Sequence, residues 1–143
     1  MNDVLNDSLL AAHFIGLMMG AGGGFGGAIV ARNAAKLPPE QAGSLRALGP
    51  ILARFAHTGL AILWVTGAIM VWSVYGGPEH LPSLFWIKFL FVLSLTVVAI
   101  ITELTYGQIK AGNVKVAARL PKIGPIAGIS SLLAAAIAAF AFH

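Results

Sequence analysis

Four ionisable side chains lie inside long apolar stretches of this 143-residue sequence, namely His13, His57, Lys88 and Glu103. A charged group within a bilayer is costly, so such residues are candidates for function. Imidazole nitrogen and a deprotonated lysine amine both carry a lone pair that can bind a metal. The sequence has no cysteine, which excludes disulfides, thiolate metal sites and iron–sulfur clusters.

Four apolar segments must position these residues. Hydrophobic residues make up 58% of the chain and charged residues only 10%, whereas a soluble domain carries about 25% charged residues. A hydrocarbon core of ~30 Å needs about 20 helical residues at ~1.5 Å each. The pattern predicts an all-α, single-domain bundle of four transmembrane helices, over approximately residues 8–31, 51–75, 83–106 and 123–142.

The charges outside these segments predict how the chain crosses the membrane. Lys and Arg gather around the first and third connections, whereas the second connection holds Glu79 and His80 and the N-terminal segment holds Asp3 and Asp7. By the positive-inside rule, the first and third connections face the cytoplasm. Both termini then lie on the outer, periplasmic side of a bacterial-type inner membrane. This topology accounts for the net charge of +4, so no nucleic-acid partner is expected.

The predicted crossings place the candidates at two depths. His13 and Lys88 each lie about five residues from the outer end of a span, or ~7–8 Å below the boundary. Their nitrogens would suit the two axial positions of a haem iron. His57 is an alternative ligand, although its backbone would lie ~13 Å from the level of His13. His57 and Glu103 form an inner pair, either a buried neutralising pair, a proton relay or a second metal site.

Glycines follow His13 at helical spacing, most clearly Gly16, Gly20 and Gly24. Glycine lowers helix stability, so this density needs a physical reason. Two interpretations are open: a bed for a flat macrocycle, or close packing of one helix on another. Arg54, one turn from His57, could face a haem propionate or a lipid phosphate.

Several segments of the chain resemble a known family. They are LLAAHFIGLMMG, LRALGPILARFAHTGLAILWVTGAIMVW, FWIKFLFVLSL and the proline-started fourth helix. Together they resemble the HemJ-type protoporphyrinogen oxidases and the wider group of small four-span proteins that includes CopD-like copper proteins. The resemblance implies that His13 and Lys88 bind haem b and that the substrate is protoporphyrinogen-like. The stretch GAGGGFGGAIVARNA lacks the further His typical of that family.

Three functions are therefore carried forward. The first is a haem b-binding redox protein of the inner membrane, an oxidoreductase that acts on a porphyrin-type substrate or transfers electrons. The second is a copper or other small-ion transporter of CopD-like type. The third is a non-catalytic subunit that forms a homo-oligomer or joins a larger complex through small-residue faces such as Ala134, Ala135, Ala136, Ala138 and Ala139.

Overall fold

Four long helices form the molecule, as the sequence predicts. The computed structural model describes residues 3–141, with side chains described up to residue 137. The helices are α1 (Asp3–Ala34), α2 (Pro39–Ser73), α3 (Ser83–Lys110) and α4 (Leu120–Ala141), with the short 3-10 helices η1 (Pro78–His80) and η2 (Val114–Arg119). Four helical segments are long and apolar enough to cross a membrane. The prediction of an all-α bundle of four such helices is confirmed.

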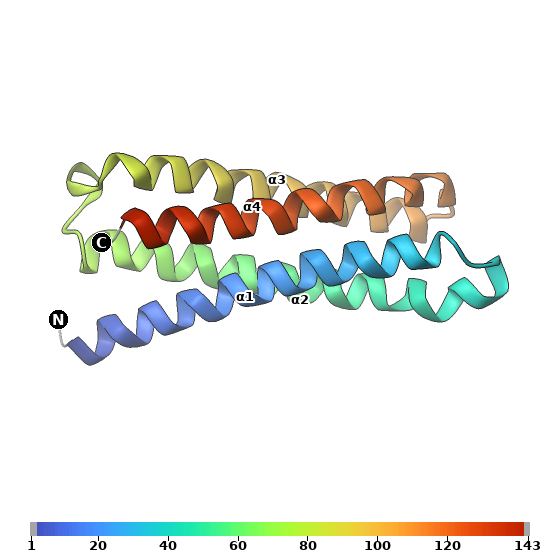
Figure 1. The fold of residues 1–143 in the computed structure, drawn as a ribbon, viewed down its shortest axis with the longest axis horizontal. Coiled ribbons are helices and arrows are strands. Elements are labelled where there is room, and N and C mark those ends of the chain that lie inside the picture. The colour runs from blue at the N-terminus through green and yellow to red at the C-terminus, as the bar shows by residue number, and fades with distance from the viewer. Residues whose placement is uncertain (1–2, 142–143) are drawn as a thin grey trace.

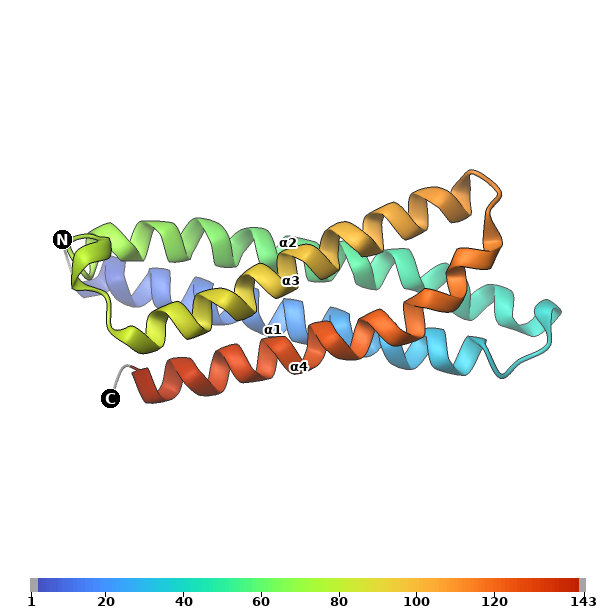
Figure 2. The same ribbon diagram turned by 90° about the horizontal axis from the view of Figure 1, so that it is seen from above.

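Successive helices run antiparallel, so α1 begins and α4 ends at the same end of the bundle (Figure 1). We call this the terminal end. The opposite end, which we call the basic end, carries the α1–α2 and α3–α4 connections (Figure 2). Every Lys and Arg except Lys88 lies in this half of the bundle: Arg32, Lys36, Arg46, Arg54, Lys110, Lys115, Arg119 and Lys122.

The four helices do not pack equally. Helix α1 packs against α2 and α4, and α3 packs against α4, whereas α2 and α3 make few contacts. The bundle therefore has three closed sides and one open side, which we call the α2–α3 seam.

The start of α2 differs from the predicted boundary. The helix begins at Pro39 rather than near residue 51, and Pro50 lies inside it. A proline is well suited to the first turn of a helix, because its missing N–H would have no partner there. Pro50 leaves only the Arg46 carbonyl without its usual donor. Hydropathy marked the apolar part of this helix and missed the polar turns that precede it.

Helices α1 and α2 are in backbone contact where they cross. A Cβ atom on Gly59 would lie 2.5 Å from the Gly16 oxygen and 2.7 Å from the Gly20 nitrogen. A Cβ atom on Gly16 would lie 2.8 Å from the Gly59 oxygen. Small residues permit this close approach of two apolar helices, where dispersion contacts replace the hydrophobic effect as the driving force.

Candidate functional site

His13 and Lys88 meet inside the terminal half of the bundle. The Lys88 Nζ atom lies 3.3 Å from His13 Nε2. The two residues come from α1 and α3, which are diagonally opposite helices, and both side chains are half-buried. The depth argument placed them at one level on separate helices, and the structure brings them into direct contact.

Thr66 of α2 fixes the orientation of the His13 ring. Its hydroxyl donates to the Ile62 carbonyl at 2.6 Å and lies 2.8 Å from His13 Nδ1. A hydroxyl has one proton, so with that proton on Ile62 the Thr66 oxygen accepts from the His13 Nδ1–H. The tautomer assigned in this way leaves a lone pair on Nε2, and that lone pair faces the Lys88 amine.

This arrangement is the one that holds a histidine ready to bind a metal. A metal-ligating histidine generally donates its other ring N–H to an oxygen, which sets the ring orientation and strengthens the ligand. Without a metal, the same geometry lets His13 Nε2 accept a hydrogen bond from Lys88. The site therefore combines one oriented imidazole with one amine in an apolar interior.

Two cavities meet at these side chains. The first, which we call the terminal cavity, measures about 410 Å³ and lies among all four helices toward the terminal end. The second, which we call the seam cavity, measures about 340 Å³ and lies between α2 and α3. Both are lined by His13 and Lys88. Ligand sites in proteins are commonly about 300–1,000 Å³, so either cavity is large enough for a small organic molecule.

The two cavities have different walls. Aromatic rings line the seam cavity: Trp64, Trp72, Phe85, Trp86 and Phe89. The terminal cavity also has polar lining residues, Asn6, Asp7 and Tyr75. Among the residues that the structure describes, the buried Asn6 Oδ1 atom has no hydrogen-bond partner. A buried amide oxygen without a partner is unfavourable.

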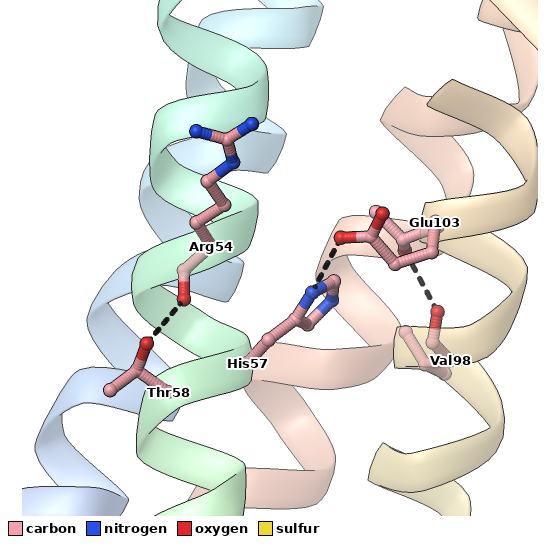
Figure 3. Close-up of polar contacts among 6 residues, drawn as sticks. Arg54, His57, Thr58, Val98 and Glu103 are labelled. Carbon is pink, nitrogen blue, oxygen red and sulfur yellow. Dashed lines mark hydrogen bonds and ion pairs between the residues drawn. The ribbon is translucent and has the colours of Figure 1, made fainter. Parts of the chain in front are cut away.

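His57 and Glu103 form a separate contact across the α2–α3 seam. His57 Nδ1 lies 2.8 Å from Glu103 Oε1, and Figure 3 shows the two side chains pointing toward one another. The Glu103 side chain is 59% exposed, so the pair lies at the surface of the bundle. Its role as a neutralising pair, a proton relay or a second metal site stays a prediction. A second polar contact crosses the same seam, from Trp64 Nε1 to Thr96 Oγ1 at 3.1 Å. His57 does not line either cavity at Lys88, and it is not placed to replace that residue.

Arg54 is not part of either contact. Its carbonyl accepts from the Thr58 hydroxyl, and its guanidinium points along α2, away from His57 and Glu103 (Figure 3). The residue is exposed and lines neither the terminal cavity nor the seam cavity. Arg54 is therefore not among the residues that line these two cavities, and its contact with a propionate or a lipid phosphate stays a prediction.

Gly16, Gly20 and Gly24 do not line the two cavities beside His13, and Gly16 and Gly24 lie against neighbouring helices. Gly16 faces Gly59 of α2, and a Cβ atom on Gly24 would lie 3.3 Å from the Cβ of Ala127 in α4. Gly20 and Gly24 line a smaller central cavity of about 80 Å³. The contacts of Gly16 and Gly24 favour the packing interpretation, and the macrocycle bed on this glycine face stays a prediction.

The sequence analysis missed two residues of the site, Thr66 and Gly67. A Cβ atom on Gly67 would lie 3.5 Å from His13 Cε1, so the ring lies close to the α2 backbone there. A threonine carries no charge and commonly bonds to its own helix. Nothing in the sequence distinguished Thr66 from the other threonines of the apolar segments.

Within residues 3–141, the described side chains include no group of three or more His, Cys, Asp or Glu residues that could together hold a metal ion. Comparisons of the chain with known protein families, with curated proteins and with solved structures gave no match. The functional interpretation therefore depends on the geometry around His13 and Lys88.

Proposed function

We propose that this protein is a small membrane redox protein that binds haem b between His13 and Lys88. The observation that carries the proposal is the His13 Nε2 lone pair, oriented through Thr66, which faces the Lys88 amine at 3.3 Å with cavities adjoining both residues. Lys88 and His13 would hold its iron. A bound haem supplies one-electron chemistry.

The donor atoms and walls suit such a group. The His13 imidazole and the Lys88 amine would hold it, since both are nitrogen donors and they lie 3.3 Å apart. The flexible four-carbon stem of Lys88 would let its amine move to admit the metal. The apolar walls of both cavities suit a macrocycle, and the aromatic rings of the seam cavity can stack on it.

The residues of this chain would have distinct tasks. His13 and Lys88 would hold the iron, and Thr66 would keep His13 in the tautomer that binds. The apolar walls exclude water, which strengthens electrostatic interactions inside the site. The open α2–α3 seam gives an apolar partner a lateral way to the seam cavity from the lipid. We propose a protoporphyrinogen-like molecule as substrate, and the bacterial inner membrane as location.

The test is an absorption spectrum of the detergent-purified protein, oxidised and dithionite-reduced, after expression with ample haem. We expect a Soret band in the parent chain and in the His57→Ala control, and its loss in His13→Ala. Lys88→Ala should shift or remove the band, because one axial ligand is gone. A colourless parent protein, or a Soret band that His13→Ala leaves unchanged, would overturn the proposal.

The substrate is tested separately. Porphyrins fluoresce and porphyrinogens do not. With a quinone added to take up the electrons and protons that the porphyrinogen loses, the haem-loaded protein should accelerate the appearance of porphyrin fluorescence from protoporphyrinogen. His13→Ala should return the rate to the uncatalysed value. A haem-loaded protein without this activity would leave electron transfer as the function of the site and remove the substrate assignment.

A further inference from the structure

The basic end of the bundle contains a third large cavity, of about 620 Å³. We call it the basic cavity. It lies among the ends of α1, α2 and α3 that point to the basic end, η2 and the first turn of α4. In Figure 2, α3 and α4 draw apart toward this end, and the segment that contains η2 joins them. Val116 of η2 is buried, which anchors this segment against the bundle.

The charge on the walls of the basic cavity has one sign. Arg46 of α2 and Lys115 of η2 line it, and none of the acidic residues of the chain does. Both basic side chains are exposed, and neither forms an ion pair within the described part of the chain. Two cations from different elements thus face one cavity with no carboxylate among its lining residues.

Most other walls of the basic cavity are apolar. They include Val30, Ala31, Ile109, Val114 and Ala117. Tyr106 adds one phenol, which also lines the central cavity beside His57. The basic cavity therefore has the character of a site for an amphiphile, with cations for an anionic group and an aliphatic surface for a chain.

The position of the basic cavity indicates where such an amphiphile comes from. The cavity lies at one end of helices long enough to cross a membrane, where lipid headgroups would lie. Basic pockets between transmembrane helices bind the headgroups of anionic lipids. Arg binds phosphate through two parallel hydrogen bonds, and Lys adds a compact charge.

We infer that the basic cavity binds an anionic phospholipid of the surrounding leaflet. The phosphate lies between Arg46 and Lys115, and an acyl chain lies on the aliphatic wall. Because Arg46 belongs to α2 and Lys115 to η2, the lipid ties the α1–α2 half of the bundle to the α3–α4 half. The inference concerns a different end of the molecule from the His13 site and does not depend on haem.

The experiment is thermal unfolding of the delipidated, full-length protein in neutral detergent, with phosphatidylglycerol, phosphatidylcholine, oleate or inorganic phosphate added. A ligand that binds only the folded state stabilises it by RT ln(1 + [L]/Kd). We expect phosphatidylglycerol to raise the melting temperature in a saturable way, and phosphatidylcholine and inorganic phosphate to have little effect. Oleate should act more weakly, because it lacks the phosphate.

Matched variants distinguish binding in the basic cavity from a general attraction of anionic lipid to the basic end. The double variant Arg46→Gln/Lys115→Gln should lose the phosphatidylglycerol shift. The control Arg54→Gln/Lys110→Gln removes the same charge from two basic residues that do not line the cavity, and it should keep the shift. Ala117→Phe should also reduce the shift, because the added ring fills part of the cavity while every charge stays.

Four outcomes would overturn the inference. They are an unchanged shift in Arg46→Gln/Lys115→Gln, an equal loss in the control, a full shift with inorganic phosphate alone, and a shift with oleate but none with phosphatidylglycerol. If Ala117→Phe does not fold, the two charge variants still decide, because all four of their positions are exposed or lie near helix ends.

Discussion

Helix α2 meets its two neighbours in opposite ways. Against α1 it packs backbone to backbone, at Gly16 and Gly59. Against α3 it makes few contacts, and the described polar ones are between long side chains, His57 with Glu103 and Trp64 with Thr96. The first interface is closed by the absence of side chains, and the second is bridged by them.

This difference explains why two histidines of one chain have such different surroundings. His13 projects from the closed α1–α2 pair, where Thr66 of the adjacent helix is close enough to fix its ring. His57 projects into the open seam, where its partner Glu103 is largely exposed. A rigid interface can therefore hold a ligand in one orientation, while the open seam leaves space for a cavity beside it.

Gly59→Ala, at the α1–α2 interface, should cause the largest decrease in the free energy of unfolding. The new methyl group would lie within 3.0 Å of backbone atoms of Gly16 and Gly20, which cannot move without separating α1 from α2. Overpacking of this kind costs about 1–3 kcal/mol. The measurement is the free energy of unfolding in mixed detergent. The spectrum of any bound chromophore should change with it.

Gly22→Ala is the matched control for that change. Outside the adjacent backbone of its own helix and its chain neighbours, no described atom lies within 4 Å of the position of its added methyl group. Removing a glycine from a helix interior stabilises it by about 0.5–1 kcal/mol. Equal destabilisation by Gly22→Ala and Gly59→Ala would show that the α1–α2 contact is not the cause.

Thr66→Val should lower the free energy of unfolding by less than Gly59→Ala does. It keeps the shape of the side chain and removes the hydroxyl. His13 Nδ1–H then loses its acceptor. Interhelical hydrogen bonds in membrane proteins contribute about 0.6 kcal/mol on average and at most about 1.7 kcal/mol. We expect the free energy of unfolding to fall by an amount close to the larger of these two values, and haem to be retained less well. Thr66→Ser keeps the hydroxyl, so it should have neither effect.

Thr105→Val is the control for the hydroxyl. Thr105 is also buried, and its described hydrogen bond goes to the Ile101 carbonyl of its own helix. Its replacement should change neither stability nor haem retention appreciably. If Thr105→Val and Thr66→Val have equal effects, the hydroxyl acts on its own helix and does not orient His13.

Glu103→Gln, at the α2–α3 seam, should cause the smallest decrease in the free energy of unfolding. Exposed ion pairs contribute about 0–1 kcal/mol, and the Glu103 side chain is 59% exposed. A double-mutant cycle with His57→Gln measures the coupling between the two side chains directly. A coupling energy as large as the loss in Thr66→Val would show that the lipid desolvates the pair, and the contrast between the two interfaces would then fail.

The amino-acid sequence determined the helices and the level of two key residues. A helix that crosses lipid must be apolar over about 20 residues, so the four apolar segments of the sequence indicate four of them. Rise per residue then converts sequence position into depth. For that reason His13 and Lys88 could be paired before any tertiary contact was known.

Only the tertiary structure shows in which direction around its helix axis each side chain points, because the depth of a residue in the membrane does not determine that direction. Gly16 was compatible with a ligand as well as with a neighbouring helix until the position of Gly59 was known. Glu103 was paired with His57 correctly, but its exposure depends on α2 and α3 lying apart. Thr66 became part of the site only because α2 turns that face toward α1. Hydropathy and spacing fix position along a helix, whereas the packing of all four helices sets which face each residue meets.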